Sequence, residues 1–214
     1  MVNPNLETNR KYKDICLYPR KIIKKNESIS AVFLDRDGVI IEDCHYIKDP
    51  NKVKLCPGAK KLLKDFYEKN IPIVIITNQS GITKKLLSWE EYKEINDRML
   101  TLLGAPNPVN AIYANSFISD KPGTNWRKPN PSMIFKAVND LNLNLNKSIL
   151  IGDRESDIIA GIRANIPRIF HVLTGHGINE RKKVLKLRNI HKNSTKSRIF
   201  CVNDLNEINK DLSF

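Results

Sequence analysis

Short apolar runs alternate with helix-like stretches along most of the chain, and this alternation constrains the fold more than any other feature. The first run is 31–34, and most of the runs are rich in β-branched residues, which is typical of strands covered on both faces. Strands that alternate with helices predict an α/β fold, with a parallel sheet and helices on both faces. The other predicted strands are 73–76, 111–114, 148–151, 168–172 and 199–202, and the predicted helices are 58–69, 88–103, 131–141, 157–164 and 204–210.

The length and composition favour one domain with tails. The chain has 214 residues, of which 41% are hydrophobic, and this is enough for a core of ordinary size. We predict a basic arm or linker at 1–29 and a domain at 30–214, with a basic insertion at 181–198. No apolar run approaches the ~20 residues that a membrane-spanning helix needs, and the N-terminus lacks an apolar signal-peptide core. We therefore expect a cytoplasmic monomer with no membrane partner.

The net charge of +13 leaves the class of partner open. It arises from 36 basic and 23 acidic residues, and such an excess could attract nucleic acid or small anionic substrates. A composition rich in Lys, Asn and Ile, with basic segments outside the core, explains it as well. We favour that explanation, so nucleic acid is an unlikely partner that is not excluded.

Two aspartates one residue apart, Asp35 and Asp37, directly follow the first predicted strand. Like charges this close repel, and Asp is unfavourable in a strand. A bound cation would remove the conflict, and magnesium-dependent catalysis by an aspartyl nucleophile needs one Asp to attack and another to move a proton. The alternative is a strand end that turns through Asp-Gly into a hairpin. The pair alone does not decide between the two.

Two further motifs carry groups that suit a phosphate ester. Thr77-Asn78-Gln79-Ser80-Gly81 follows the strand 73–76, and its hydroxyl and N–H groups could bind phosphate oxygens, although such a segment is usually only a turn. Arg127 and Lys128 precede a predicted helix. Lys128 could neutralise a transferring phosphoryl group, and Arg127 could hold a second anionic or polar group. The alternative for this pair is a solvated basic loop.

The last motif places Asp153 after the strand 148–151 and Asp157 one helical turn later. Oxygen ligands of this kind suit Mg²⁺, a hard cation. Asp157 could instead cap a helix. Each motif follows a strand or opens a helix, so all of them should meet at the carboxyl edge of the sheet, where parallel sheets bind ligands.

Together, these motifs resemble the haloacid dehalogenase-like superfamily of aspartyl phosphotransferases. Within it they are similar to the branch of the heptose bisphosphate phosphatases and histidinol-phosphate phosphatases, over about residues 31–175 with a weaker match at 199–205. The resemblance implies a Rossmann-like fold and a small phosphorylated sugar as substrate. The segments 43–57 and 115–127 are too short to hold a large cap domain.

The resemblance also implies a role for each matching residue. Asp35 would be the nucleophile, Asp37 the acid and base, and Thr77 and Lys128 would stabilise charge on the phosphoryl group. Mg²⁺ would be held by Asp35, the carbonyl of Asp37 and Asp153, with a weaker contribution from Asp157 behind them. The expected substrate-binding residues are Arg36, Asp43, His45, Tyr46, Asn78, Gln79, Ser80 and Arg127.

One segment departs from the pattern of the branch. Most members carry a zinc loop with three cysteines and a histidine, but 113–126 contains neither residue type, so we expect no zinc and a loop held by packing of Phe117 or Trp126. Because this loop borders the site, the substrate stays open. A heptose bisphosphate is favoured, and the alternatives are histidinol phosphate, a polynucleotide 3′-phosphate and a non-catalytic binding module.

Overall fold

A computed structural model describes residues 7–9, 14–17, 29–118, 126–193 and 196–210. The strands are β1 (Glu7–Asn9), β2 (Asp14–Leu17), β3 (Val32–Leu34), β4 (Ile73–Asn78), β5 (Ala111–Asn115), β6 (Ile149–Gly152), β7 (Arg168–His171) and β8 (Arg198–Cys201). The α-helices are α1 (Ala59–Glu68), α2 (Ser80–Thr83), α3 (Trp89–Leu103), α4 (Ser132–Leu141), α5 (Glu155–Arg163) and α6 (Gly177–Ile190). Short 3₁₀ helices are η1 (Pro50–Lys52), η2 (Leu145–Lys147) and η3 (Leu205–Lys210).

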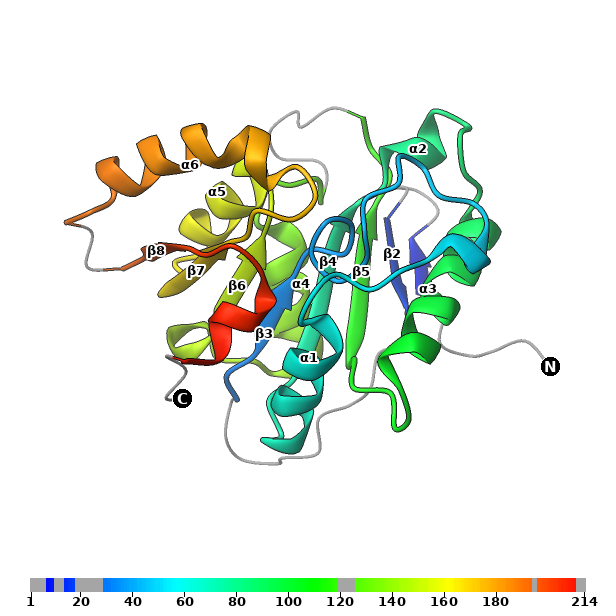
Figure 1. Cartoon of the computed structure of the whole chain (residues 1–214), viewed down its shortest axis with the longest axis horizontal. Helices are drawn as coiled ribbons and strands as arrows, with labels where there is room; N and C mark the ends of the chain where they lie inside the picture. Colours follow the sequence, from blue (N-terminus) through cyan, green and yellow to red (C-terminus); the bar gives the residue numbers. More distant parts are fainter. Residues whose placement is uncertain (1–6, 10–13, 18–28, 119–125, 194–195, 211–214) are drawn as a thin grey trace.

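All these strands belong to one sheet. Its order is β1-β2-β5-β4-β3-β6-β7-β8, which runs from right to left in Figure 1. The strands from β5 to β8 in this order are parallel, and β2 joins the edge of β5 in the antiparallel direction. The predicted α/β fold with a parallel sheet is therefore confirmed, and each of the predicted strands has a counterpart.

Helices cover both faces of the sheet. Side chains of a strand alternate in direction, so the apolar strands present a hydrophobic surface on each face. Val32 and Leu34 of β3 point to the face covered by α1, α3 and η3, where Phe66 and Ile95 are buried. Phe33 points to the opposite face, which is covered by α4, α5 and α6. All of these core side chains are nearly inaccessible to solvent. A central strand covered on both faces positions the residues that follow it rigidly.

Helix starts follow the local capping chemistry. Ser88 accepts a hydrogen bond from the Glu91 N–H, and Glu91 accepts one from the Ser88 N–H, so the capping box predicted for α3 is present. Helix α5 begins at Glu155, two residues before the predicted start, because Asp157 lies at its third position and accepts from the Arg154 N–H. The predicted helix at 204–210 is the 3₁₀ helix η3.

Two segments differ from their sequence-based description. In the region predicted as an arm or linker at 1–29, β1 and β2 extend the sheet beyond β5. Much of the basic insertion predicted at 181–198 belongs to α6, which starts before it and buries Val184 against the second face of the sheet. The division into arm and domain itself stays a prediction.

The chain between β3 and α1 contains no element larger than η1, and the described part between β5 and α4 contains none, as expected for a fold without a large cap domain. Within the described ranges, no helix is both long and apolar enough to cross a membrane.

Candidate active site

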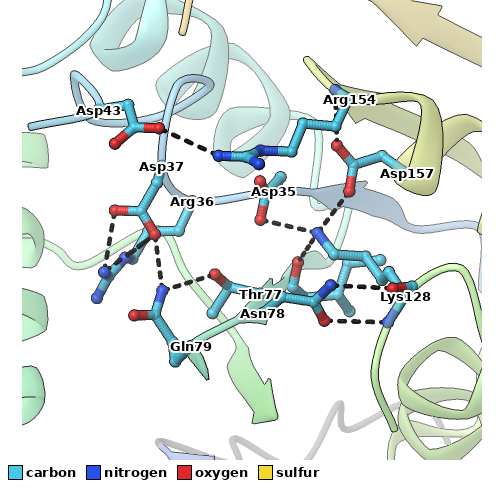
Figure 2. A network of polar contacts seen from close by, with 11 residues as sticks. Asp35, Arg36, Asp37, Asp43, Thr77, Asn78, Gln79, Lys128, Arg154 and Asp157 are labelled. Carbon is cyan, nitrogen blue, oxygen red and sulfur yellow. Dashed lines mark hydrogen bonds and ion pairs between the residues drawn. The ribbon is translucent and has the colours of Figure 1, made fainter. Parts of the chain in front are cut away.

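Lys128 joins two carboxylates at the carboxyl edge of the sheet (Figure 2). Its Nζ lies 2.8 Å from Asp35 Oδ1 and 2.6 Å from Asp157 Oδ1, and it donates a hydrogen bond to the carbonyl of Ile76 at 2.8 Å. Burial opposes the charge on Lys128, but Asp157 and Asp35 outweigh it and raise the pKa of Lys128. The ammonium is therefore a fixed positive charge beside Asp35.

Asn78 holds the main chain of Lys128 in place. Its side-chain amide donates to the carbonyl of Lys128 and accepts from the Lys128 N–H, both at 3.0 Å. This pair of bonds joins the end of β4 to the loop before α4. Asn78 is predicted to bind substrate, and it lies in the wall of the cavity. Its side-chain amide is bonded to the main chain of Lys128 and positions that residue.

Three carboxylates form a cluster that fits a hard cation. One ligand atom each of Asp35, Asp153 and Asp157 lies within 4.8 Å of the other two, and all three residues are buried. Burial, together with the charges of Asp157 and Asp35, raises the pKa of Asp153 to about 8. Burial also raises the pKa of Asp35 to about 6, against the opposing charge of Lys128. A divalent cation would favour the ionised form of each carboxylate.

Asp153 has a carboxylate oxygen that is available to bind a cation. Its Oδ2 accepts a hydrogen bond from the His176 N–H at 2.7 Å, whereas its Oδ1 is buried without a hydrogen-bond partner among the described residues. Gly38 makes room for this side chain, since a Cβ at this position would lie 2.5 Å from Asp153 Oδ2. The φ of Gly38, +82°, also favours glycine. An unpartnered carboxylate oxygen in an all-oxygen donor set fits Mg²⁺.

Asp37 is held from two sides. Arg36 Nη2 lies 3.0 Å from both carboxylate oxygens of Asp37, and Arg36 Nε donates to Oδ2 at 3.2 Å. Gln79 Nε2 donates to Asp37 Oδ2 at 2.7 Å and to Thr77 Oγ1 at 2.9 Å. Figure 2 shows these groups beside Asp35, so the residues after β3 and those at the end of β4 meet as predicted from strand order.

A polar cavity of about 550 Å³ opens above Asp35 and Asp37. Small-molecule sites usually occupy about 300–1,000 Å³, so this volume suits a substrate of metabolite size. Of the predicted site residues, Thr77 and Asp153 are buried and do not line the cavity, whereas the others contribute to its wall. These others are Asp35, Arg36, Asp37, Asp43, His45, Tyr46, Asn78, Gln79, Ser80, Arg127, Lys128 and Asp157.

The rim contains charged residues that the sequence motifs do not single out. Asp43 Oδ2 lies 2.7 Å from His176 Nε2 and 3.4 Å from Arg154 Nη2. Despite partial burial, the His45 N–H and the charges of His176 and Arg154 keep the pKa of Asp43 below its usual value. Arg154 follows Asp153 directly, so it could be found from that motif. His176 has no such signal, because only the fold brings the loop after β7 to this rim.

The loop that lacks zinc ligands is described at its two ends, and 119–125 lie outside the described residues. The ring of Trp126 packs against Tyr113, with ring centroids 5.9 Å apart, and Arg127 Nη1 donates to the carbonyl of Phe117 at 3.1 Å. The first contact fastens one end of the loop to β5, in line with the expected packing of Trp126, and the second ties the two ends of the loop together.

Known proteins share this fold and sequence pattern. The family model of the haloacid dehalogenase-like hydrolases matches residues 19–171. A D-glycero-beta-D-manno-heptose-1,7-bisphosphate 7-phosphatase of Mesorhizobium japonicum is 35% identical over 148 residues, which are 64% of this chain and 67% of that protein. A D-glycero-alpha-D-manno-heptose-1,7-bisphosphate 7-phosphatase of Photorhabdus laumondii is 34% identical over 172 residues, which are 73% of this chain and 89% of that protein.

A solved structure gives the same result. The D,D-heptose 1,7-bisphosphate phosphatase of B. bronchiseptica, complexed with magnesium and phosphate, superposes with a TM-score of 0.69 at 26% identity. The match covers 84% of this chain and 96% of that chain. The chain therefore belongs to the haloacid dehalogenase-like hydrolases, in their phosphatase branch.

Proposed function

We propose that this chain is a Mg²⁺-dependent phosphatase that removes the 7-phosphate of D-glycero-D-manno-heptose 1,7-bisphosphate through an aspartyl phosphate. The observation that carries this proposal is the position of Asp35 in the cavity, 2.8 Å from Lys128 and clustered with Asp153. The names of the relatives support the substrate. Because those names include both the alpha and the beta anomer, we propose no preference between anomers.

In the first step, a carboxylate oxygen of Asp35 attacks the phosphorus, and the bond from phosphorus to the sugar oxygen breaks. Asp37 gives its proton to the leaving alkoxide, which is a poor leaving group without one. The ammonium of Lys128 faces Asp35, so it neutralises negative charge on the phosphoryl oxygens during the transfer. Thr77 lies near the end of β4, where its hydroxyl accepts from Gln79; we assign the proton of this hydroxyl to a phosphoryl oxygen.

In the second step, a water molecule attacks the phosphorus of the aspartyl phosphate. Asp37, now a carboxylate, takes a proton from that water, and inorganic phosphate leaves as Asp35 is restored. Each step transfers one proton through Asp37, so this residue returns to its starting state. The same two residues thus serve both half-reactions.

The carboxylates of Asp35 and Asp153 would hold the Mg²⁺ ion, with Asp157 close behind them. When bound, Mg²⁺ supplies a Lewis-acid charge that polarises the phosphoryl group and offsets the repulsion between it and Asp35. Without the ion, Lys128 is the cation that faces both Asp35 and Asp157.

The test is phosphate release from a panel of esters with Mg²⁺. Heptose 1,7-bisphosphate, as both anomers, should be hydrolysed faster than histidinol phosphate or DNA with a 3′-phosphate. Asp35→Asn should abolish turnover while the protein keeps its thermal unfolding transition. Preference for 3′-phosphorylated DNA, with strong salt dependence, would contradict the proposed substrate. Wild-type-like turnover by Asp35→Asn would contradict the nucleophile.

Two further expectations belong to this proposal and need their own measurements. Gel filtration should show a monomer, and metal analysis of the purified protein should show no stoichiometric zinc.

A further inference from the structure

Arg36 lies in the motif between the two aspartates, and its side chain points into the protein. Only 2% of the side chain is exposed. Its guanidinium carbon lies 4.6 Å from the centroid of the Tyr92 ring, and Nη1 donates to Asn96 Oδ1 at 3.0 Å. Tyr92 and Asn96 are one turn apart on the buried side of α3. Tyr92 and Asn96 of α3 therefore hold the guanidinium of Arg36 in a fixed position.

The other two nitrogen atoms of the guanidinium, Nε and Nη2, face Asp37. Nε and Nη2 form a two-pronged contact with the carboxylate, at 3.0–3.2 Å. A guanidinium is planar and rigid, so a contact of this kind sets the plane of the carboxylate as well as its distance. Gln79 binds Asp37 Oδ2 from another side at 2.7 Å. Substrate contact by Arg36 stays a prediction, and its contacts in the structure are with protein groups.

We propose that Arg36 is a positioning residue for Asp37: it holds the plane of the carboxylate so that Asp37 is aimed at the leaving oxygen. This inference rests on the proposed phosphatase mechanism. In a fold without a large cap domain, the acid and base would then be oriented by the body of the protein, through a chain of contacts from α3 to Arg36 to Asp37.

The role can be separated from substrate binding by the choice of leaving group. A sugar alkoxide needs a proton to leave, whereas 4-nitrophenolate leaves without one. If Arg36 acts through Asp37, Arg36→Gln should slow turnover of a sugar phosphate by about 10²-fold or more, within the range of general acid catalysis. The burst of 4-nitrophenolate from 4-nitrophenyl phosphate, which reports formation of the aspartyl phosphate, should slow much less.

Arg36→Lys provides the graded variant. Lysine keeps the charge but cannot form the two-pronged contact, so turnover of the sugar phosphate should fall between that of the wild type and that of Arg36→Gln. Arg154→Gln is the matched control. It removes another arginine from the same cavity, one that pairs with Asp43 and not with Asp37, so it should leave the ratio of the two rates unchanged.

Three results would overturn the inference. Equal slowing of both esters would mean that Arg36 is structural, a raised KM with unchanged kcat would mean that it binds substrate, and wild-type rates would mean that it has no role. Failure of the proposed function looks different, because the wild type would then not hydrolyse the sugar phosphate with Mg²⁺, whatever its rate with 4-nitrophenyl phosphate.

Discussion

Lys128 is buried among acidic groups. It contacts Asp35 and Asp157, and all three side chains are at most 8% exposed. Removal of one partner from a buried ion pair leaves an uncompensated charge, which usually costs about 3–5 kcal/mol. We expect Lys128→Met to lower the free energy of unfolding of the metal-free protein by an amount of this order, measured by urea unfolding. Turnover should fall by at least about 10²–10³-fold.

The double variant Lys128→Met/Asp157→Asn is the control for this expectation. It removes the charge of Asp157 together with its partner, so the double variant should be more stable than Lys128→Met alone, although equally inactive. If Lys128→Met unfolds at the same urea concentration as the wild type, the ion pairs contribute no net stability, and Lys128 is retained for catalysis alone.

At the scale of an element, the start of α5 depends on the same Asp157. Its Oδ1 faces Lys128, and its Oδ2 accepts the hydrogen bond of the Arg154 N–H at 3.0 Å. The choice between a site residue and a helix cap is therefore not exclusive, since the side chain has an oxygen for each partner.

Two substitutions separate these contributions. Both are made in the Lys128→Met protein, because the single side-chain oxygen of Asp157→Asn could not face Lys128 and Arg154 at once. In that background Asp157→Asn keeps an oxygen that can accept from Arg154, whereas Asp157→Ala loses it. The alanine variant should be less stable than the asparagine variant by about 1 kcal/mol, the usual value of a helix cap. Equal unfolding free energies of the two variants would show that the cap contributes nothing to stability.

The elements show how far residue patterns predict this structure. The strands that carry the motifs are predictable because their apolar runs are short and bounded by turns, and parallel strands bring their carboxyl ends to one edge. The place of Asp35 and Asp153 at that edge follows from this rule, whereas Lys128 precedes a helix and its role beside Asp35 is what the family resemblance implies. Strands β1 and β2 are not predictable in this way, since β1 is polar, the apolar run of β2 is only three residues long, and the edge of β5 with which β2 pairs is distant in sequence.

The partners of individual side chains are less predictable than the elements. Arg36 and Asn78 belong to motifs that suit a phosphate ester, so contact with substrate is the natural expectation from sequence. Their protein partners, Asn96 and the main chain of Lys128, come from other elements. Such pairings depend on tertiary distances of a few ångströms, which spacing along the chain does not determine.

At the scale of the whole molecule, a cation bound by the cluster of Asp35, Asp153 and Asp157 would link metal binding to stability. A ligand that binds only the folded state stabilises it, by about 2.7 kcal/mol at 100 times its Kd. We therefore expect Mg²⁺ to raise the Tm of the wild type, measured by calorimetry at constant ionic strength. The shift should vanish in Asp153→Asn, because this residue contributes the unpartnered oxygen. An equal shift in that variant would place the cation elsewhere.

A trapped aspartyl phosphate would test most directly that Asp35 is the nucleophile. In Asp37→Asn, 4-nitrophenyl phosphate can still phosphorylate Asp35, but no base remains to activate water, so the covalent species should accumulate. After acid quench and peptide mass spectrometry, we predict the added mass of one phosphoryl group on Asp35, with one 4-nitrophenolate released per active site. A phosphoryl group on another residue, or steady turnover without any covalent species, would contradict this assignment.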